Sequence, residues 1–205
     1  MRPVPVDGGP SEGQPRPLLD VHLQLLDLIW DEGYTFDSVR WPDDMGYKQH
    51  TFFSLGMYRE IVLPFQKKAI DWAHAKGIRA HLHSCGDIHT FVPELVAAGL
   101  DALNPLEVKA GMDPVALKRQ FGDRLVLHGG INAVLWDKPA EIRAEMERVV
   151  PILKENGGYI FSSDHSPGLL RLDRAAGRSY LFRSLRQVSS SRSSEQPLDA
   201  TGWKP

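Results

Sequence analysis

The sequence has a single cysteine, Cys85, no long apolar run and almost no net charge. One cysteine excludes an internal disulfide framework and indicates a reducing compartment, so we expect a cytoplasmic protein. No apolar run approaches the roughly 18 residues that span a bilayer, and residues 1–17 lack the apolar centre of a secretory signal. Lysine and arginine total 24 against 26 aspartates and glutamates. This balance argues against a protein that binds nucleic acid or a membrane surface.

The motifs of several common enzyme classes are also missing. The sequence contains neither Gly-x-Gly-x-x-Gly nor Gly-x-x-x-x-Gly-Lys-Ser/Thr, so a nucleotide would lack its usual phosphate-binding loop. The Gly-x-Ser-x-Gly turn that carries a nucleophilic serine is absent as well. These absences count against nucleotide-binding proteins and serine hydrolases.

Apolar periodicity predicts an alternation of helices and strands. The expected strands are residues 34–41, 78–84, 101–104, 125–127 and 159–162. The expected helices are residues 18–33, a segment from a Ser54 cap to Lys76 that Pro64 must kink or divide, and residues 88–98, 114–121 and 139–154. Residues 45–53 are expected to form a loop. Five strands separated by helices indicate successive βα units and a parallel sheet, an α/β fold.

Composition divides the chain into three parts. Residues 1–17 are rich in proline and glycine and are predicted to be a disordered leader. Residues 18–168 hold the βα units. Residues 169–205 contain six arginines and a serine-rich end, and are predicted to be a basic helix followed by a disordered tail.

Polar residues follow every predicted strand, where the sites of parallel βα proteins lie. The five strand ends carry Asp43 and Asp44; His83, Cys85 and Asp87; Asn104 and Glu107; His128 and Asn132; and Asp164 and His165. Glu107 and Asn132 could each serve as ligand, acid/base or substrate anchor, and periodicity does not choose among these roles. Asp43 and Asp44 fit an acid/base pair or a Pro-Asp-Asp turn equally well.

The second strand end carries the sharpest signal. Alternate strand residues share a face, so His81, His83 and Cys85 would point the same way if the strand continued to Cys85. Imidazole and thiolate are ligands that zinc prefers, and His165 is the candidate third ligand. Three protein ligands and one open position are typical of catalytic zinc. The alternative is a buried cysteine beside a core or surface histidine, with Asp164 as a cap or as a partner that orients a histidine.

Several motifs together resemble the uroporphyrinogen decarboxylase superfamily. They are His83-Ser-Cys85-Gly86-Asp87, Leu103-Asn-Pro-Leu-Glu107-Val-Lys-Ala-Gly-Met-Asp113, His128-Gly-Gly-Ile-Asn132, Gly157-Gly-Tyr-Ile-Phe-Ser-Ser-Asp164-His165-Ser166, Trp41-Pro-Asp-Asp44-Met-Gly-Tyr-Lys48 and Met57-Tyr-Arg-Glu60. The resemblance covers residues 18–166 and is nearest to the branch of the corrinoid:thiol (methylcobamide:coenzyme M) methyltransferases.

The resemblance implies a (βα)8 TIM-type barrel with its site at the carboxyl ends of the strands. In the methyltransferases, zinc bound by His-x-Cys and a later cysteine activates the acceptor thiol, which takes a methyl group from cobalt. His83 and Cys85 match the first two ligands, and His165 stands where the later cysteine would be. Zinc, a corrinoid carried by a partner protein and a small-molecule methyl acceptor are therefore expected. Glu107 is expected to be a fourth ligand or a pocket acid, with Asp44 and Asn132 as further catalytic candidates.

Two alternative functions stay open on the sequence. Decarboxylases of the superfamily use no metal and bind an acidic tetrapyrrole in porphyrin biosynthesis, but their binding residues map to no position here. The other alternative is an inactive or partner-dependent βα module. Five strands instead of eight predict a partial barrel and an N-terminally truncated member. The open sheet edges of a partial barrel predict a homodimer, completion by another fragment, or aggregation.

Overall fold

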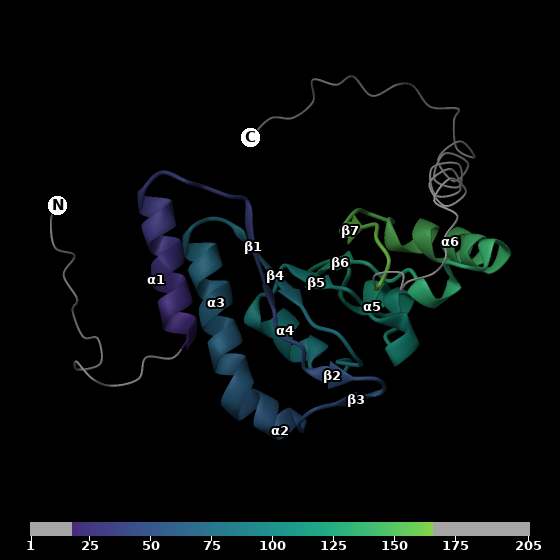
Figure 1. Ribbon diagram of the computed structural model, residues 1–205, viewed down its shortest axis with the longest axis horizontal. Coiled ribbons are helices and arrows are strands. Elements are labelled where there is room, and N and C mark those ends of the chain that lie inside the picture. The colour runs from purple at the N-terminus through teal and green to yellow at the C-terminus, as the bar shows by residue number, and fades with distance from the viewer. Residues whose placement is uncertain (1–17, 166–205) are drawn as a thin grey trace, which may run out of the picture.

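The computed structural model describes residues 18–165, so the predicted leader (residues 1–17) and basic tail (residues 169–205) lie outside the described residues. One parallel sheet of five strands, in the order β1-β4-β5-β6-β7, forms the centre (Figure 1). Its strands are β1 (Ser38–Pro42), β4 (Arg79–His83), β5 (Ala102–Asn104), β6 (Val126–His128) and β7 (Tyr159–Ile160). This confirms the predicted α/β fold, a partial barrel with about five parallel strands.

The helices follow the strands as the periodicity predicted. They are α1 (Leu18–Asp31), α2 (Leu55–Met57), α3 (Leu63–Ala75), α4 (Val92–Ala98), α5 (Pro114–Phe121) and α6 (Pro139–Leu153). Figure 1 shows α1 and α3 side by side near β1, with α5 and α6 together near β7. No helix among the described residues is long and apolar enough to cross a bilayer.

The two faces of the sheet differ in chemistry. One face carries Ala80, Leu82, Leu103 and Leu127, which are buried in the main hydrophobic cluster together with helix side chains. The opposite face, here called the interior face, carries polar groups. Its strands are in register so that Arg40 lies beside His81, and His83 lies beside both Pro42 and Asn104. Because neighbouring residues in a parallel register point to the same side, these polar side chains share one surface.

The segment before α3 departs from a single kinked helix. The Ser54 hydroxyl accepts a hydrogen bond from the Met57 backbone N–H at 3.2 Å, as the predicted cap requires. A π-helical turn over Tyr58–Val62 then separates α2 from α3. Pro64 lies in the first turn of α3, where its missing N–H leaves no helical hydrogen bond unmade. The predicted segment is therefore divided, and the proline stands at the beginning of α3.

The expected loop over residues 45–53 is a short hairpin instead. Strands β2 (Gly46–Tyr47) and β3 (His50–Thr51) pair antiparallel around Lys48, whose φ is 49°. Two-residue strands are too short to give an alternating apolar pattern, so the sequence carried no strand signal. The hairpin matters because it lies against the turn that holds Cys85.

Candidate metal centre

The central feature of the site is the turn that follows β4. The strand ends at His83, and Cys85 lies in the turn beyond it. The Cys85 Sγ is 3.4 Å from the His83 Nε2. Two such atoms bound to one tetrahedral zinc at ordinary bond lengths lie about 3.5 Å apart. The spacing of this pair therefore fits a shared metal ion.

Further potential ligands surround Cys85. Among the described residues, two groups of three have donor atoms within 4.8 Å of one another: Asp44, His83 and Cys85, and Cys85, Glu107 and His165. Cys85 belongs to both groups, whereas His83 and His165 do not share one. The structure thus brings each predicted histidine ligand to the cysteine, with a carboxylate beside each pair.

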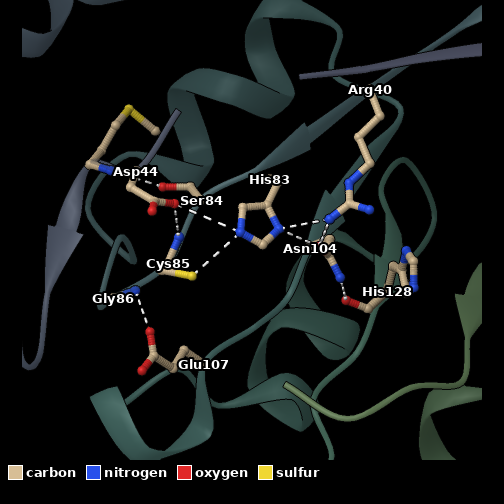
Figure 2. Close-up of polar contacts among 10 residues, drawn as sticks. Arg40, Asp44, His83, Ser84, Cys85, Gly86, Asn104, Glu107 and His128 are labelled. Carbon is tan, nitrogen blue, oxygen red and sulfur yellow. Dashed lines mark hydrogen bonds and ion pairs between the residues drawn. The ribbon is translucent and has the colours of Figure 1, made fainter. Parts of the chain in front are cut away.

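Two carboxylates hold the Cys85 turn by its backbone. The Cys85 N–H donates to the Asp44 Oδ1 at 2.9 Å, and the next N–H, of Gly86, donates to the Glu107 Oε2 at 2.6 Å (Figure 2). Glu107 is buried, and its other oxygen is 3.3 Å from the Lys109 Nζ. Asp44 and Glu107 come from the ends of the two strands that flank β4. They therefore position the thiol from both sides.

The same carboxylates act on the charge of the thiol. Burial, then the charges of Asp44 and Glu107, raise the pKa of Cys85 to about 11. The bare thiol is therefore protonated at neutral pH. Negative charge around the sulfur favours a cation, and a coordinated divalent metal holds cysteine as the thiolate.

Asn104 and Arg40 both contact the Nδ1 of His83. The Asn104 Nδ2 donates to the His128 carbonyl at 3.2 Å, which turns its Oδ1 toward the His83 Nδ1 at 2.6 Å. The Arg40 Nη2 lies 2.8 Å from the same Nδ1 and donates to the Asn104 Oδ1 at 2.6 Å. An amide oxygen only accepts and a guanidinium only donates, so these two contacts favour opposite tautomers of His83. Together they orient the ring so that its Nε2 faces Cys85 and Asp44.

Close backbone contact joins the hairpin to the Cys85 turn. A Cβ on Gly86, whose φ is +82°, would lie 2.2 Å from the Gly46 carbonyl carbon. The Gly46 N–H donates to the Cys85 carbonyl at 3.2 Å, and the Asp87 N–H donates to the Lys48 carbonyl at 2.9 Å. Glycine at position 86 is required both for its backbone conformation and for this contact.

His81 does not join Cys85. It lies one layer deeper on the interior face, with its ring centroid 5.3 Å from that of His128. Burial, then the nearby His128, Arg40 and His83, lower the pKa of His81 to about 4. The strand ends at His83, so Cys85 does not continue the row of strand side chains formed by His81 and His83. Of these two histidines, His83 is the one that contacts the thiol.

Asp164 and His165 have separate environments. The Asp164 side chain is fully buried and accepts from the Val108 N–H and the Ala133 N–H, both at 2.8 Å. It therefore joins the loops after β5 and β6, as a cap, and these hydrogen-bond partners within residues 18–165 are backbone groups and not a histidine. Burial raises its pKa, against the lowering effect of these hydrogen bonds. His165 is exposed and approaches Cys85.

Two further candidate residues, Asn132 and Asp43, form hydrogen bonds that support the fold. The Asn132 Oδ1 accepts from the Val134 N–H at 3.0 Å, so this side chain caps a short 3-10 helix, and Asn132 belongs to neither ligand group. The Asp43 Oδ2 accepts from the Gln66 Nε2 at 2.7 Å, and Gln66 in turn accepts from the buried Tyr58 hydroxyl. Asp43 is thus part of a structural network that ties β1 to α3.

Asn104 and His128 were noted in the sequence only as polar residues at strand ends, without a role, and Arg40 was not predicted for the site. Each lies on the interior face within the last three residues of its strand. The available signal was their position at alternate strand residues, the same pattern that pointed to His83. That signal needed the register between strands, which a single sequence does not provide.

Comparison with known proteins shows which family the chain belongs to. A solved structure, "methyltransferase from Methanosarcina mazei", has the same fold with a TM-score of 0.57 and 15% sequence identity. The match covers 83% of this chain and 47% of that one, so this chain spans about half the length of its structural neighbour. No curated protein matches the sequence. The family model described as "Uroporphyrinogen decarboxylase (URO-D)" matches residues 37–168, and the chain therefore belongs to the uroporphyrinogen decarboxylase family.

Proposed function

We propose that this chain binds zinc through His83, Cys85 and His165 and serves the transfer of a methyl group from a corrinoid to a thiol-type acceptor. The observation that carries the proposal is the 3.4 Å separation of the Cys85 Sγ and the His83 Nε2, with the carboxylates of Asp44 and Glu107 close to the sulfur. The name of the structural neighbour, a methyltransferase, supports the same reaction class.

Zinc, when bound, would lower the pKa of a coordinated acceptor thiol so that the thiolate is present at neutral pH. The residues of this chain have three tasks around it. Cys85 and His83 offer a sulfur and a nitrogen, and three protein ligands leave one position for the acceptor. Asn104 and Arg40 hold the His83 ring by its Nδ1, which leaves Nε2 toward Cys85. Asp44 and Glu107 fix the Cys85 backbone and offset the positive charge of the metal.

The remaining expectations about the whole protein stay predictions. They are a corrinoid carried by a partner protein, a cytoplasmic location and a homodimer. The dimer prediction is supported by the sheet order, which leaves β1 and β7 as edge strands in the described part of the chain. A second copy on one of these edges would shield unpaired backbone groups.

Metal analysis of the full chain tests the metal site. After purification with zinc present and removal of free metal, we expect about one zinc per chain, because Cys85 lies close to both His83 and His165, with a carboxylate beside each pair. Cys85→Ala and His83→Ala should each lose the metal. His22→Ala, which removes an exposed imidazole on α1, is the matched control and should keep it. A wild-type chain without zinc would refute the proposal.

The reaction is tested separately on the zinc-loaded chain. Methylcobalamin and a small thiol are mixed, and the appearance of the methyl thioether and loss of the methyl–cobalt absorption are followed. We expect turnover that disappears with Cys85→Ala. A chain that binds zinc but transfers no methyl group would support the inactive-module alternative. Binding of a porphyrinogen to a zinc-free chain would support decarboxylation instead.

A further inference from the structure

A second polar cluster lies on the other edge of the His83 ring. Figure 2 shows Asp44, Cys85 and Glu107 on one side of His83, and Arg40, Asn104 and His128 on the other. His81 completes this second cluster, because it is in register with Arg40 and its ring is 5.3 Å from that of His128. We call Arg40, His81 and His128 the interior basic cluster.

The interior basic cluster contains hydrogen-bonding groups without partners. The His81 Nε2 and the His128 Nδ1 are enclosed and bond to no atom of the described residues. His81 is only 9% exposed. An unsatisfied buried polar atom costs about 1–3 kcal/mol, so such atoms are uncommon unless a ligand or water meets them. Two of them in adjacent rings indicate a place where a polar group binds.

The charge of the cluster is also unbalanced. Within residues 18–165, the side-chain contacts of Arg40 are to His83 and Asn104, and no carboxylate pairs with it. The groups whose charges act on His81 are His128, Arg40 and His83, all of them basic. Arg40 is exposed at the open side of the sheet and retains further N–H donors. The cluster therefore attracts an anion.

We propose that Arg40, His81 and His128 bind a carboxylate of a small molecule. The planar guanidinium matches a carboxylate in two parallel hydrogen bonds, and each neutral imidazole can donate one more. Arg40 contributes one positive charge, which balances a monoanion. The donors are strand side chains and not the backbone N–H groups of a helix N-terminus, the arrangement that usually receives phosphate.

The carboxylate site is tested on the full chain without metal. Chelator-treated protein is titrated with sodium propionate, and the histidine ring signals are followed by NMR. We expect saturable shifts at His81 and His128, no shifts with 1-propanol, and at least tenfold weaker binding in Arg40→Gln. Arg119→Gln, which removes an exposed arginine on α5, is the matched control. Arg40→Lys keeps the charge without the planar fork and should weaken binding by a smaller factor.

Several outcomes would overturn the proposal. They are the absence of propionate shifts in the wild type, equal shifts with 1-propanol, or propionate binding unchanged in a folded Arg40→Gln chain. Tighter binding of inorganic phosphate with the same dependence on Arg40 would overturn the choice of a carboxylate. Backbone amide signals are compared between each variant and the wild type. Agreement of these signals excludes misfolding as the cause of lost binding.

Discussion

Asp164 offers the strongest test of how the site is supported. Its two carboxylate oxygens accept from the Val108 and Ala133 backbone N–H groups at 2.8 Å each, and the side chain is fully buried. Asp164→Ala leaves both N–H groups without this partner in a buried region. Each lost charge-assisted bond costs about 1.5–3 kcal/mol, and removing a costly buried charge returns part of it. We expect the free energy of unfolding to fall by about 3 kcal/mol.

The assay is urea unfolding of the full chain, followed by circular dichroism, with Asp164→Asn and Asp123→Ala beside it. Asparagine keeps one accepting oxygen, so its loss should be about half that of alanine. Asp123 is largely exposed, and its removal should change stability by less than about 0.5 kcal/mol. A cost below about 1 kcal/mol for Asp164→Ala would show that these loops do not depend on the carboxylate, and the reasoning would be refuted.

Three further predictions concern the site and its scaffold. Gly86→Ala places a Cβ against Gly46 at an unfavourable φ, so it should lower the free energy of unfolding in urea by about 2 kcal/mol and lower the zinc content. Stability and zinc content equal to those of the wild type would contradict the close contact. Asn104→Leu should weaken zinc binding about 10–100-fold in competition with a chelator, because His83 loses a partner that orients its ring, and unchanged affinity would disprove that role. Asp101 is half-buried, which raises its pKa, but hydrogen bonds from Ala80 and other groups outweigh burial and lower it overall. The stabilisation from ionised Asp101 should be present above the unfolded-state pKa of about 4 and be lost as the pH falls through the lower pKa of the folded state. Asp101→Asn should therefore be less stable than the wild type at pH 7, and the difference in the free energy of unfolding should be smaller at pH 3. A constant gap in urea unfolding at the two pH values would exclude this linkage.

The parts of the fold with strong periodicity were predictable from the sequence. Residues 114–121 were expected to be helical and form α5, because Asp113 caps them and Pro114 starts them. The apolar runs before His83 and Asn104 are buried strands, as their composition indicated. Local chemistry was sufficient at these positions, since each cap, proline or apolar run acts within a few residues.

The site was predictable only where its residues are close in sequence. His83 and Cys85 are two residues apart, so closeness in sequence was enough to bring them together, although the strand ends at His83 and Cys85 lies in the turn beyond it. The contact from Asn104 to His83 and the unpartnered nitrogens of His81 and His128 depend on the register between separate strands. Register comes from tertiary packing, which no local pattern in one sequence specifies.

The order of the strands has a consequence for how the site forms. Along the sheet, β4, β5, β6 and β7 follow one another as they do in the sequence, and only the hairpin and two short helices intervene between β1 and α3. Asp44, the Cys85 turn and Glu107 therefore come from three neighbouring strands, and each contact closes a chain loop of modest length. Loops of this kind cost little entropy to close and favour rapid folding. The cysteine turn can thus be assembled as soon as β5 joins β4, before the segments that carry His128 and His165 have been added.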